Sequence, residues 1–154
     1  MSYVDRNLLP GEEVVYRAKL HWIVFAAPVL VLVVAVILIA SAGGNRGHAA
    51  VSGIGVVFMI IAGALAFSRW LARVSSEFAV TNKRVLIKVG FIRRHSLELL
   101  LQKVEGIGVD QGIWGRVFDY GTIMVTGTGG TKEPFKNIAA PLEFRKQVQS
   151  RVTA

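Results

Sequence analysis

WIVFAAPVLVLVVAVILIASA, the stretch from Trp22 to Ala42, is 21 residues long and is interrupted only by Pro28 and Ser41. As an α-helix rising 1.5 Å per residue it extends roughly 30 Å, the thickness of a bilayer's hydrocarbon core. A second apolar run, AAVSGIGVVFMIIAGALAFSRWL, covers residues 49–71, and only the six residues from Gly43 to His48 separate the two. Such a short link makes the two helices antiparallel neighbours. We therefore predict a transmembrane hairpin with spans at 22–42 and 49–71.

Basic residues indicate which side of the membrane holds the chain ends. Arg17 and Lys19 precede the first run and further basic residues follow the second, whereas the connecting loop holds Arg46 alone. Under the positive-inside rule both termini lie in the cytoplasm. Tryptophans at the interface and basic residues that reach the headgroups are typical of the cytoplasmic ends of spans. The predicted membrane-interface anchors are Trp22, Arg69, Trp70 and Arg73.

Two buried helices in a soluble core are the alternative, but no remaining segment is large enough to enclose them. We expect Pro28 to kink the first helix, which membrane helices tolerate. Small residues at four-residue spacing would allow close helix approach, within the hairpin or between subunits. The pairs are Ala49/Gly53, Ala62/Ala66 and Ala64/Ser68.

The composition agrees with a membrane protein that carries a basic domain. Apolar residues make up 53% of the chain and charged residues 18%, with a net charge of +8 and no cysteine. From Val74 onward there are twelve Lys/Arg and seven acids. Such a balance suits an anionic membrane surface or nucleic acid. Without aromatics interleaved among the basic residues, we expect no nucleic-acid partner.

The region after the second run reads as a series of antiparallel strands. Phe78 and Val80 alternate with polar or small residues, and the turn Asn82-Lys83 joins them to a second alternating strand. Gly127–Gly130 reads as a hairpin loop and not as a phosphate-binding loop, because no helix follows it. The six predicted strands cover residues 77–81, 84–89, 95–99, 105–111, 120–126 and 132–138.

Three further segments complete the predicted fold. Glu13–Lys19 alternates as a half-buried strand, and a lone strand needs a sheet to join. We hypothesise that it completes the sheet after the hairpin. Ile113–Phe118 looks like one helical turn whose aromatics plug the end of a sheet. After Pro141, Phe144, Val148 and Val152 recur at four-residue spacing, which predicts an amphipathic helix.

Several short motifs follow one another along nearly the whole chain. They are Leu9–Glu13 (LPGEE), His21-Trp22, Thr81–Val85 (TNKRV), Gly90-Phe91, Lys103–Ile107 (KVEGI), Gly115-Arg116 and Tyr120–Thr122 (YGT). In this order they resemble the bacterial pleckstrin-homology-like family, whose members often carry two spans before the domain. The resemblance implies an α+β fold: a PH-like antiparallel β-barrel or sandwich of seven strands, capped by a C-terminal α-helix, without known enzymatic activity.

The candidate contact site is a basic cluster on the predicted hairpins. These side chains could meet lipid phosphates or a protein partner, although a merely solvated basic face explains them as well. Inositol-lipid binding at comparable loops occurs in eukaryotic relatives, but bacteria generally lack those lipids. The candidate contact residues are Lys83, Arg84, Lys88, Arg93 and Arg94.

Catalysis, metal and cofactor binding are not predicted. His21, His48 and His95 are too widely separated in the predicted topology to share a metal. Ser96 and His95 lack the setting of a catalytic triad, and no small-molecule substrate is evident. Neither span holds an ionisable residue at its centre, which argues against an ion pathway within one subunit.

Two functions follow as hypotheses. The first is a non-enzymatic PH-like module, anchored in the bacterial cytoplasmic (inner) membrane, that mediates protein interaction, self-assembly or anionic-lipid contact. The alternative is a subunit of an oligomeric transport or channel assembly. In either case the expected parts are a cytoplasmic N-terminal segment (1–21), a transmembrane hairpin (22–73) and a cytoplasmic domain (74–154). The expected partners are membrane lipids and a protein partner or further copies of the chain.

Overall fold

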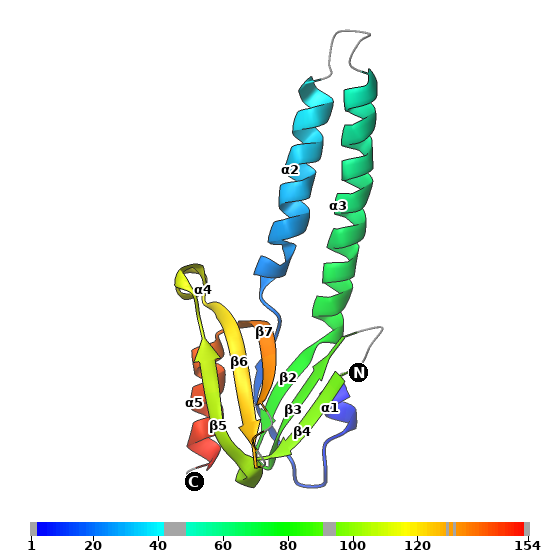
Figure 1. Ribbon diagram of the computed structural model, residues 1–154. Helices are drawn as coiled ribbons and strands as arrows, with labels where there is room; N and C mark the ends of the chain where they lie inside the picture. The colour runs from blue at the N-terminus through cyan, green and yellow to red at the C-terminus, as the bar shows by residue number, and fades with distance from the viewer. Residues whose placement is uncertain (1–2, 42–48, 91–94, 129, 131, 153–154) are drawn as a thin grey trace. The chain divides into compact units, whose positions relative to one another are not determined.

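The chain folds into two compact units (Figure 1). The computed structural model describes residues 3–41, 49–90, 95–128, 130 and 132–152. Residues 22–71 form one unit, here called the helical unit. Residues 1–21 and 72–154 together form the other, the β unit. The β unit is therefore assembled from both sides of the helical unit in the chain.

The helical unit holds two long apolar helices. A 3-10 turn, η1 (Trp22–Phe25), leads into α2 (Ala26–Ser41), and α3 covers Ala49–Ser75. Pro28, where we expected a kink, is the third residue of α2. In the first turn of a helix the backbone N–H has no intrahelical acceptor, so proline costs nothing there.

Small residues form the seam between α2 and α3, but at a different spacing from that predicted. Ala35 of α2 is fully buried, and Pro28, one heptad earlier, is buried as well. Gly55 and Ala62 are the buried residues of α3, also seven apart. A Cβ on Gly55 would lie 2.6 Å from Ile39 Cγ1 and 3.1 Å from the Ala35 carbonyl oxygen. Gly53, in contrast, has no atom within 4 Å of such a Cβ. The seam therefore follows the heptad of antiparallel helices and not the four-residue pairs.

The β unit contains two antiparallel sheets. The first has four strands in the order β1-β2-β3-β4, and the second has three in the order β5-β6-β7. Six strands lie close to their predicted positions, and the seventh, β1, comes before the helical unit. The strands are β1 (Val14–Ala18), β2 (Glu77–Thr81), β3 (Arg84–Val89), β4 (His95–Leu100), β5 (Val104–Asp110), β6 (Tyr120–Gly127) and β7 (Lys132–Ala139).

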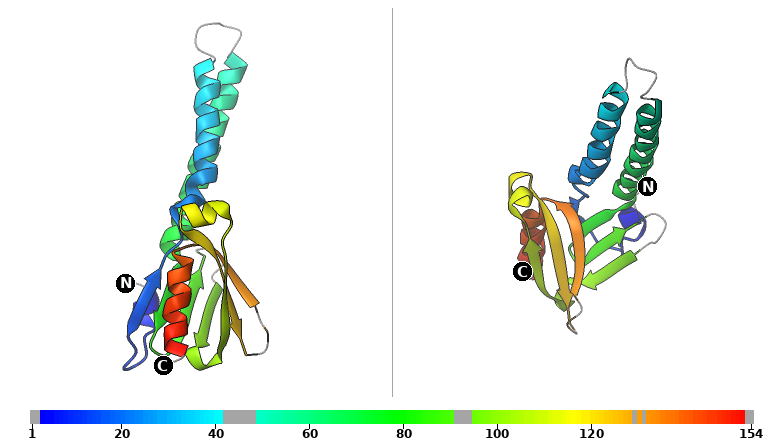
Figure 2. Two further views of the ribbon diagram at one scale, coloured as in Figure 1. Left: turned by 90° about the vertical axis from the view of Figure 1, so that its left-hand side faces the viewer. Right: turned by 45° about the horizontal axis from the view of Figure 1, so that its top comes forward.

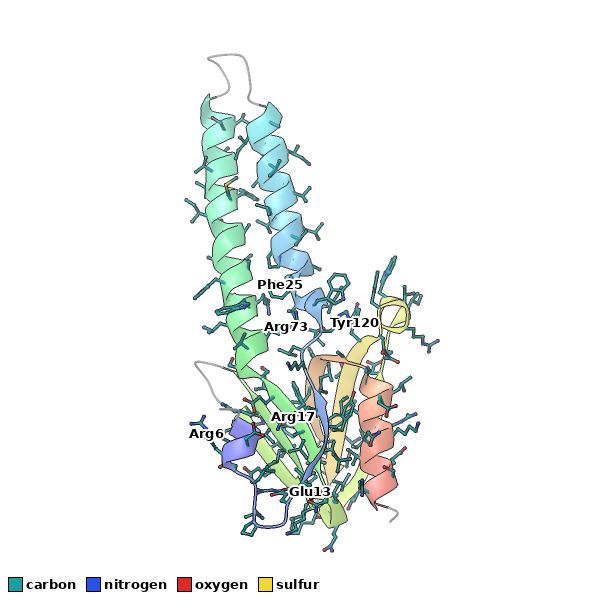
Figure 3. The ribbon with its side chains drawn as sticks, turned by 180° about the vertical axis from the view of Figure 1, so that it is seen from behind. Arg6, Glu13, Arg17, Phe25, Arg73 and Tyr120 are labelled. Carbon is teal, nitrogen blue, oxygen red and sulfur yellow. The ribbon has the colours of Figure 1, made fainter. Side chains whose placement is uncertain are left out.

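Strand β1 pairs antiparallel with β2 although the whole helical unit separates them in the chain. Arg17 lies opposite Ala79 and Ala18 opposite Phe78, with a register shift between Val14 and Tyr16. Figure 3 shows β1 from behind, with Arg17 labelled on it. The four-stranded sheet thus takes one edge strand from before the helices and the other three from after them.

We expected a β-barrel or a β-sandwich. The two sheets do not close into a barrel and instead form an open arrangement. At one corner an isolated bridge joins Leu20 to Ile138, and the His21 amide donates to the Asn137 carbonyl at 2.7 Å. Elsewhere the 3-10 turn η3 (Leu101–Lys103) separates β4 from β5. This turn redirects the chain from the first sheet to the second. The hydrogen bonds of each sheet therefore stay between its own strands.

The C-terminal helix α5 (Pro141–Val152) covers the apolar space between the sheets, as predicted (Figure 2, left). It contacts β1 and β2 of one sheet and β5 and β6 of the other. Phe144 and Val148 are fully buried, and burying each contributes roughly 1.5–3 kcal/mol. The main core combines residues of both sheets and this helix: Ala18, Phe78, Val80, Val85, Ile87, Leu101, Val104, Ile107, Ile123, Val125, Phe135, Ile138, Phe144 and Val148.

A second, smaller core lies on the other face of the four-stranded sheet. Ala79 and Leu86 point to this face and pack with Val4 of the short helix α1 (Tyr3–Arg6). Figure 3 shows this helix with Arg6 labelled. The segment before the helical unit therefore contributes an edge strand to the sheet and a cover for its outer face.

Candidate functional site

Two of the sequence motifs, Leu9–Glu13 and Thr81–Val85, contact each other directly. The Asn82 side chain accepts from the Glu13 amide at 3.1 Å and donates to the Gly11 carbonyl at 3.2 Å. Lys83 Nζ donates to the Pro10 carbonyl at 3.0 Å. The β2–β3 turn is thus bonded side chain by side chain to the segment that leads into β1. We call the whole group, Leu9–Glu13 together with Thr81–Arg84, the arm–turn cluster.

Glu12 is the centre of the arm–turn cluster. Its side chain is fully buried, with one carboxylate oxygen 2.9 Å from Arg84 Nε and 2.7 Å from the Thr81 hydroxyl. The other oxygen accepts from the Leu9 amide at 2.7 Å and from Arg84 Nη2 at 3.0 Å. Burial raises the pKa of Glu12, but the hydrogen bonds from Arg84, Leu9 and Thr81 outweigh it and lower that pKa to about 2. The carboxylate therefore remains charged at neutral pH.

Arg84, a candidate lipid contact in the sequence, is occupied inside the protein. Its side chain is only 12% exposed, and Nη1 donates to Glu98 at 2.7 Å besides the bonds to Glu12. Hydrogen bonding to Glu12 is the largest of the effects that raise the pKa of Arg84. These bonds to two carboxylates give the Arg84 guanidinium a structural role.

The other basic candidates differ in placement. Lys83 is exposed but bonded to Pro10, as described above. Lys88 of β3 is half-buried, with its ammonium 4.6 Å from the centroid of the Tyr3 ring. Arg93 and Arg94 lie outside the described residues. Among the described candidates, Lys83 alone presents an exposed side chain.

The predicted interface anchors are divided between the helical unit and the β unit. In the helical unit Trp22 and Trp70 are each 52% exposed, and Arg69 is exposed as well. Arg73 belongs to the β unit and is half-buried. Its charge acts on the nearby His21.

The end of the β unit where the chain passes into the helical unit is closely packed. His21 is 9% exposed, and its ring stacks on Tyr120 with centroids 5.3 Å apart. Figure 3 labels Tyr120 and Arg73 at this end. Burial, and then the Arg73 charge, lower the pKa of His21, against smaller opposing effects of Asp119 and the Phe118 backbone. The imidazole is therefore neutral at neutral pH.

Three strained backbone positions surround this end of the β unit. Asp119, Asn137 and Ala140 have φ values of 55°, 59° and 48°, which non-glycine residues rarely adopt. The Ala140 amide donates to the Asp119 carbonyl at 3.0 Å, and the Asn137 carbonyl accepts from His21. Such strain persists only where surrounding contacts hold it, so this corner has a defined geometry.

The helical turn after β5 is present as α4 (Ile113–Val117), but its aromatics do not plug a sheet. Trp114 is 67% exposed and stacks on Phe118, which is 40% exposed. The residue that packs inward is Gly115, because a Cβ there would lie 2.5 Å from the Tyr120 carbonyl oxygen. Sequence reasoning missed this because apolar residues usually mark the buried face of a helix. The one contrary signal was the glycine between Trp114 and Arg116.

Across the described ranges, no three His, Asp or Glu side chains gather as metal ligands. A depression of about 220 Å³ beside α4 is lined by residues that include Asp110, Tyr120 and Thr122. Asp110 is the one carboxylate among these lining residues.

Comparison with known proteins found one match. A family model described as "Bacterial PH domain" matches residues 22–152. The match includes both apolar helices and the β unit from β2 to α5, and it begins after β1. Neither a curated protein nor a solved structure matches the chain.

Proposed function

The chain belongs to the bacterial PH domain family, and we propose that it is a non-enzymatic module, anchored in the membrane by its helical unit, that serves protein or lipid interaction. PH-like domains are generally non-catalytic and act in interaction, and the described residues of this one carry no positive sign of an enzyme.

One observation carries the proposal: the hairpin is inserted between two paired strands of the interaction domain. β1 ends four residues before the first apolar helix, and β2 begins two residues after the second. Both helices are long and apolar enough to cross a membrane. In the most apolar stretch of each helix, only 11% of the residues are buried. Low burial argues against core helices of a soluble protein. A domain held by two short connections to a membrane hairpin stays at the membrane surface.

The proposed orientation places the β unit on the cytoplasmic side. The loop at residues 42–48 carries Arg46 as its single Lys or Arg, whereas both flanks are richer in basic residues. This distribution favours a loop outside the cytoplasm. In a bacterium, the membrane would be the cytoplasmic (inner) membrane.

Cysteine labelling tests anchoring and orientation together, because the chain has no cysteine of its own. We expect a membrane-impermeant maleimide to label an Asn45→Cys variant in intact cells. A Gln102→Cys variant, in the β unit, should be labelled only after permeabilisation. Recovery of the full chain in the supernatant after membranes are pelleted without detergent would overturn the proposal.

For protein partners, including a second copy, the surface we propose is the edge strand β4. It ends the four-stranded sheet, and Leu100 is 47% exposed. Exposed edges accept an added strand, and a lysine on the edge prevents this. Crosslinking and pull-down from native membranes should recover a partner with the unaltered chain and lose it with Leu100→Lys. The control is Val152→Lys, at a residue 45% exposed on α5. Equal recovery by both variants would exclude β4.

For anionic lipids, the proposed contact rests on the basic pair Arg93 and Arg94. Each basic side chain near an anionic surface contributes roughly 1 kcal/mol. Charge reversal at both positions should reduce the anionic phospholipid that copurifies with the full chain. Reversal of Arg145 and Lys146, an adjacent basic pair on α5, is the matched control. If the two variants retain equal amounts of lipid, the lipid role is excluded.

A further inference from the structure

Four large apolar residues on α4 and directly after it are exposed on the β unit. Ile113 is 82% exposed, Trp114 67%, Val117 66% and Phe118 40%. We call these four residues the apolar tip. Single exposed apolar residues are ordinary, but four large ones within six positions form a patch, and such patches mark interaction sites.

The tip is held rigidly at its base. Gly115 is buried against the Tyr120 carbonyl, where any larger residue would collide. The Gln111 side-chain amide donates to the Gly115 carbonyl at 3.3 Å and to the Tyr120 carbonyl at 3.2 Å. Since the backbone of α4 is fixed from below, its apolar side chains are presented outward in a defined position.

The tip also adjoins the point where the chain leaves the β unit for the first apolar helix. Tyr120 stacks on His21, and the Phe118 backbone hydrogen-bonds to the same His21. His21 is the residue immediately before Trp22, where that helix begins. Covalent continuity therefore keeps the tip close to the place where the chain would enter a bilayer.

Its residue types suit the interfacial zone of a membrane. Tryptophan is enriched at that depth, and phenylalanine, isoleucine and valine gain from leaving water. Arg116 is the one charged residue from Gly112 to Phe118, and it carries the sign that anionic headgroups attract. A protein partner fits less well, because a stable interface needs about 800 Å² per partner, far more than a single helical turn supplies.

We propose that the apolar tip inserts into the interfacial zone of the bilayer that holds the helical unit. The tip gives the β unit a third attachment to the membrane beside its two chain connections and so limits its rotation at the surface. The inference rests on the proposed membrane anchoring.

The experiment uses the full chain in vesicles of mixed zwitterionic and anionic phospholipid. With no native cysteine, a nitroxide can be attached at one site at a time. The sites are Val117 in the tip, Val152 at the far end of α5 as an exposed control, and Ile37 in the first apolar helix. Val152 and Ile37 are 45% and 60% exposed. Accessibility to oxygen relative to a water-soluble nickel complex reports depth in the bilayer.

We expect the oxygen-to-nickel ratio at Val117 to be well above that at Val152 and below that at Ile37. A Val117 ratio as low as at Val152, with Ile37 deep, overturns the tip but leaves the anchoring intact. An aqueous Ile37 overturns the anchoring itself. Spin–spin broadening at Val117 that disappears on dilution with unlabelled protein assigns the tip to a second copy, which also overturns bilayer insertion.

Discussion

Glu12 and Arg84 show how a charged residue can belong to the fold. A buried ion pair is costly to break, because removing one partner leaves the other charge unpaired in the interior. Glu12 accepts four hydrogen bonds through its two carboxylate oxygens. The two from Arg84 link the segment before β1 to the β2–β3 turn.

The first prediction is that Glu12→Gln lowers the free energy of unfolding of the β unit by about 3 kcal/mol. Thermal unfolding of the full chain in detergent measures this. Arg84→Met should cost less in the Glu12→Gln background than alone, because the two residues share one interaction. Fully additive losses would contradict the pairing.

Acid titration provides the second prediction, from the same carboxylate. The pKa of Glu12 is about 2 in the folded protein against an ordinary 4.5. A depressed carboxyl pKa contributes stability that is present above pH 4.5 and is lost as the pH falls toward 2. The unaltered protein should therefore lose stability across this range, and Glu12→Gln should remove that part of the loss. A profile unchanged by the substitution would contradict it.

His21 gives the third prediction, which is that stability decreases as the pH falls, because the buried imidazole resists protonation. Its pKa is lowered from the ordinary 6.5, so below that value the unfolded chain binds a proton that the folded chain resists. Stability is then fully present above pH 6.5 and declines as the pH falls through it. His21→Phe should flatten the unfolding free energy in this window, whereas His95→Gln, at a side chain 60% exposed, should leave the decline in place. A decline that persists in His21→Phe would refute the assignment.

Among the elements, the α2–α3 seam depends on the absence of a side chain at one position. Gly55→Leu would drive the helices apart at Ile39, and overpacking of this kind costs about 1–3 kcal/mol. Gly53→Leu is the matched control, because a Cβ at this position meets no atom within 4 Å. Thermal unfolding followed by circular dichroism in detergent should separate the two variants. Equal stability would show that the helices do not meet at Gly55.

Strand β1 gives a prediction for amide exchange. Its pairing with β2 should slow exchange at Tyr16, Arg17 and Ala18 to rates comparable with β3. Hydrogen exchange of the full chain, read by mass spectrometry, measures this. Fast exchange across β1 beside slow exchange in β3 would mean that the strand is not held in the sheet.

For the whole molecule, the transport or channel alternative requires several copies. Neither apolar helix holds an ionisable residue at its centre, so one copy cannot line a polar path. Detergent-corrected light scattering distinguishes the proposals: a monomer at all concentrations eliminates the pore, and the anchored module remains.

The two helices and all seven strands, including β1 within the predicted Glu13–Lys19, could be predicted from the sequence, since each depends on a local pattern. Hydrophobic length identifies a helix able to span a bilayer, and period-two alternation with turn residues identifies a hairpin. The family could also be identified, because its motifs lie in order along the chain. The expected helix after Pro141 was confirmed for the same reason, since Phe144 and Val148 recur on one face.

The tertiary structure alone decided which side chains of distant segments contact one another. It paired Glu12 with Arg84, which lie 72 positions apart in the chain, and so placed one of the candidate contact residues in a largely buried ion pair. It set the helix seam at Gly55, and it turned the apolar residues of α4 outward because Gly115 packs inward. A local pattern records that a residue is apolar or charged. Only the surrounding chain determines whether that residue faces a core, a partner charge or the outside.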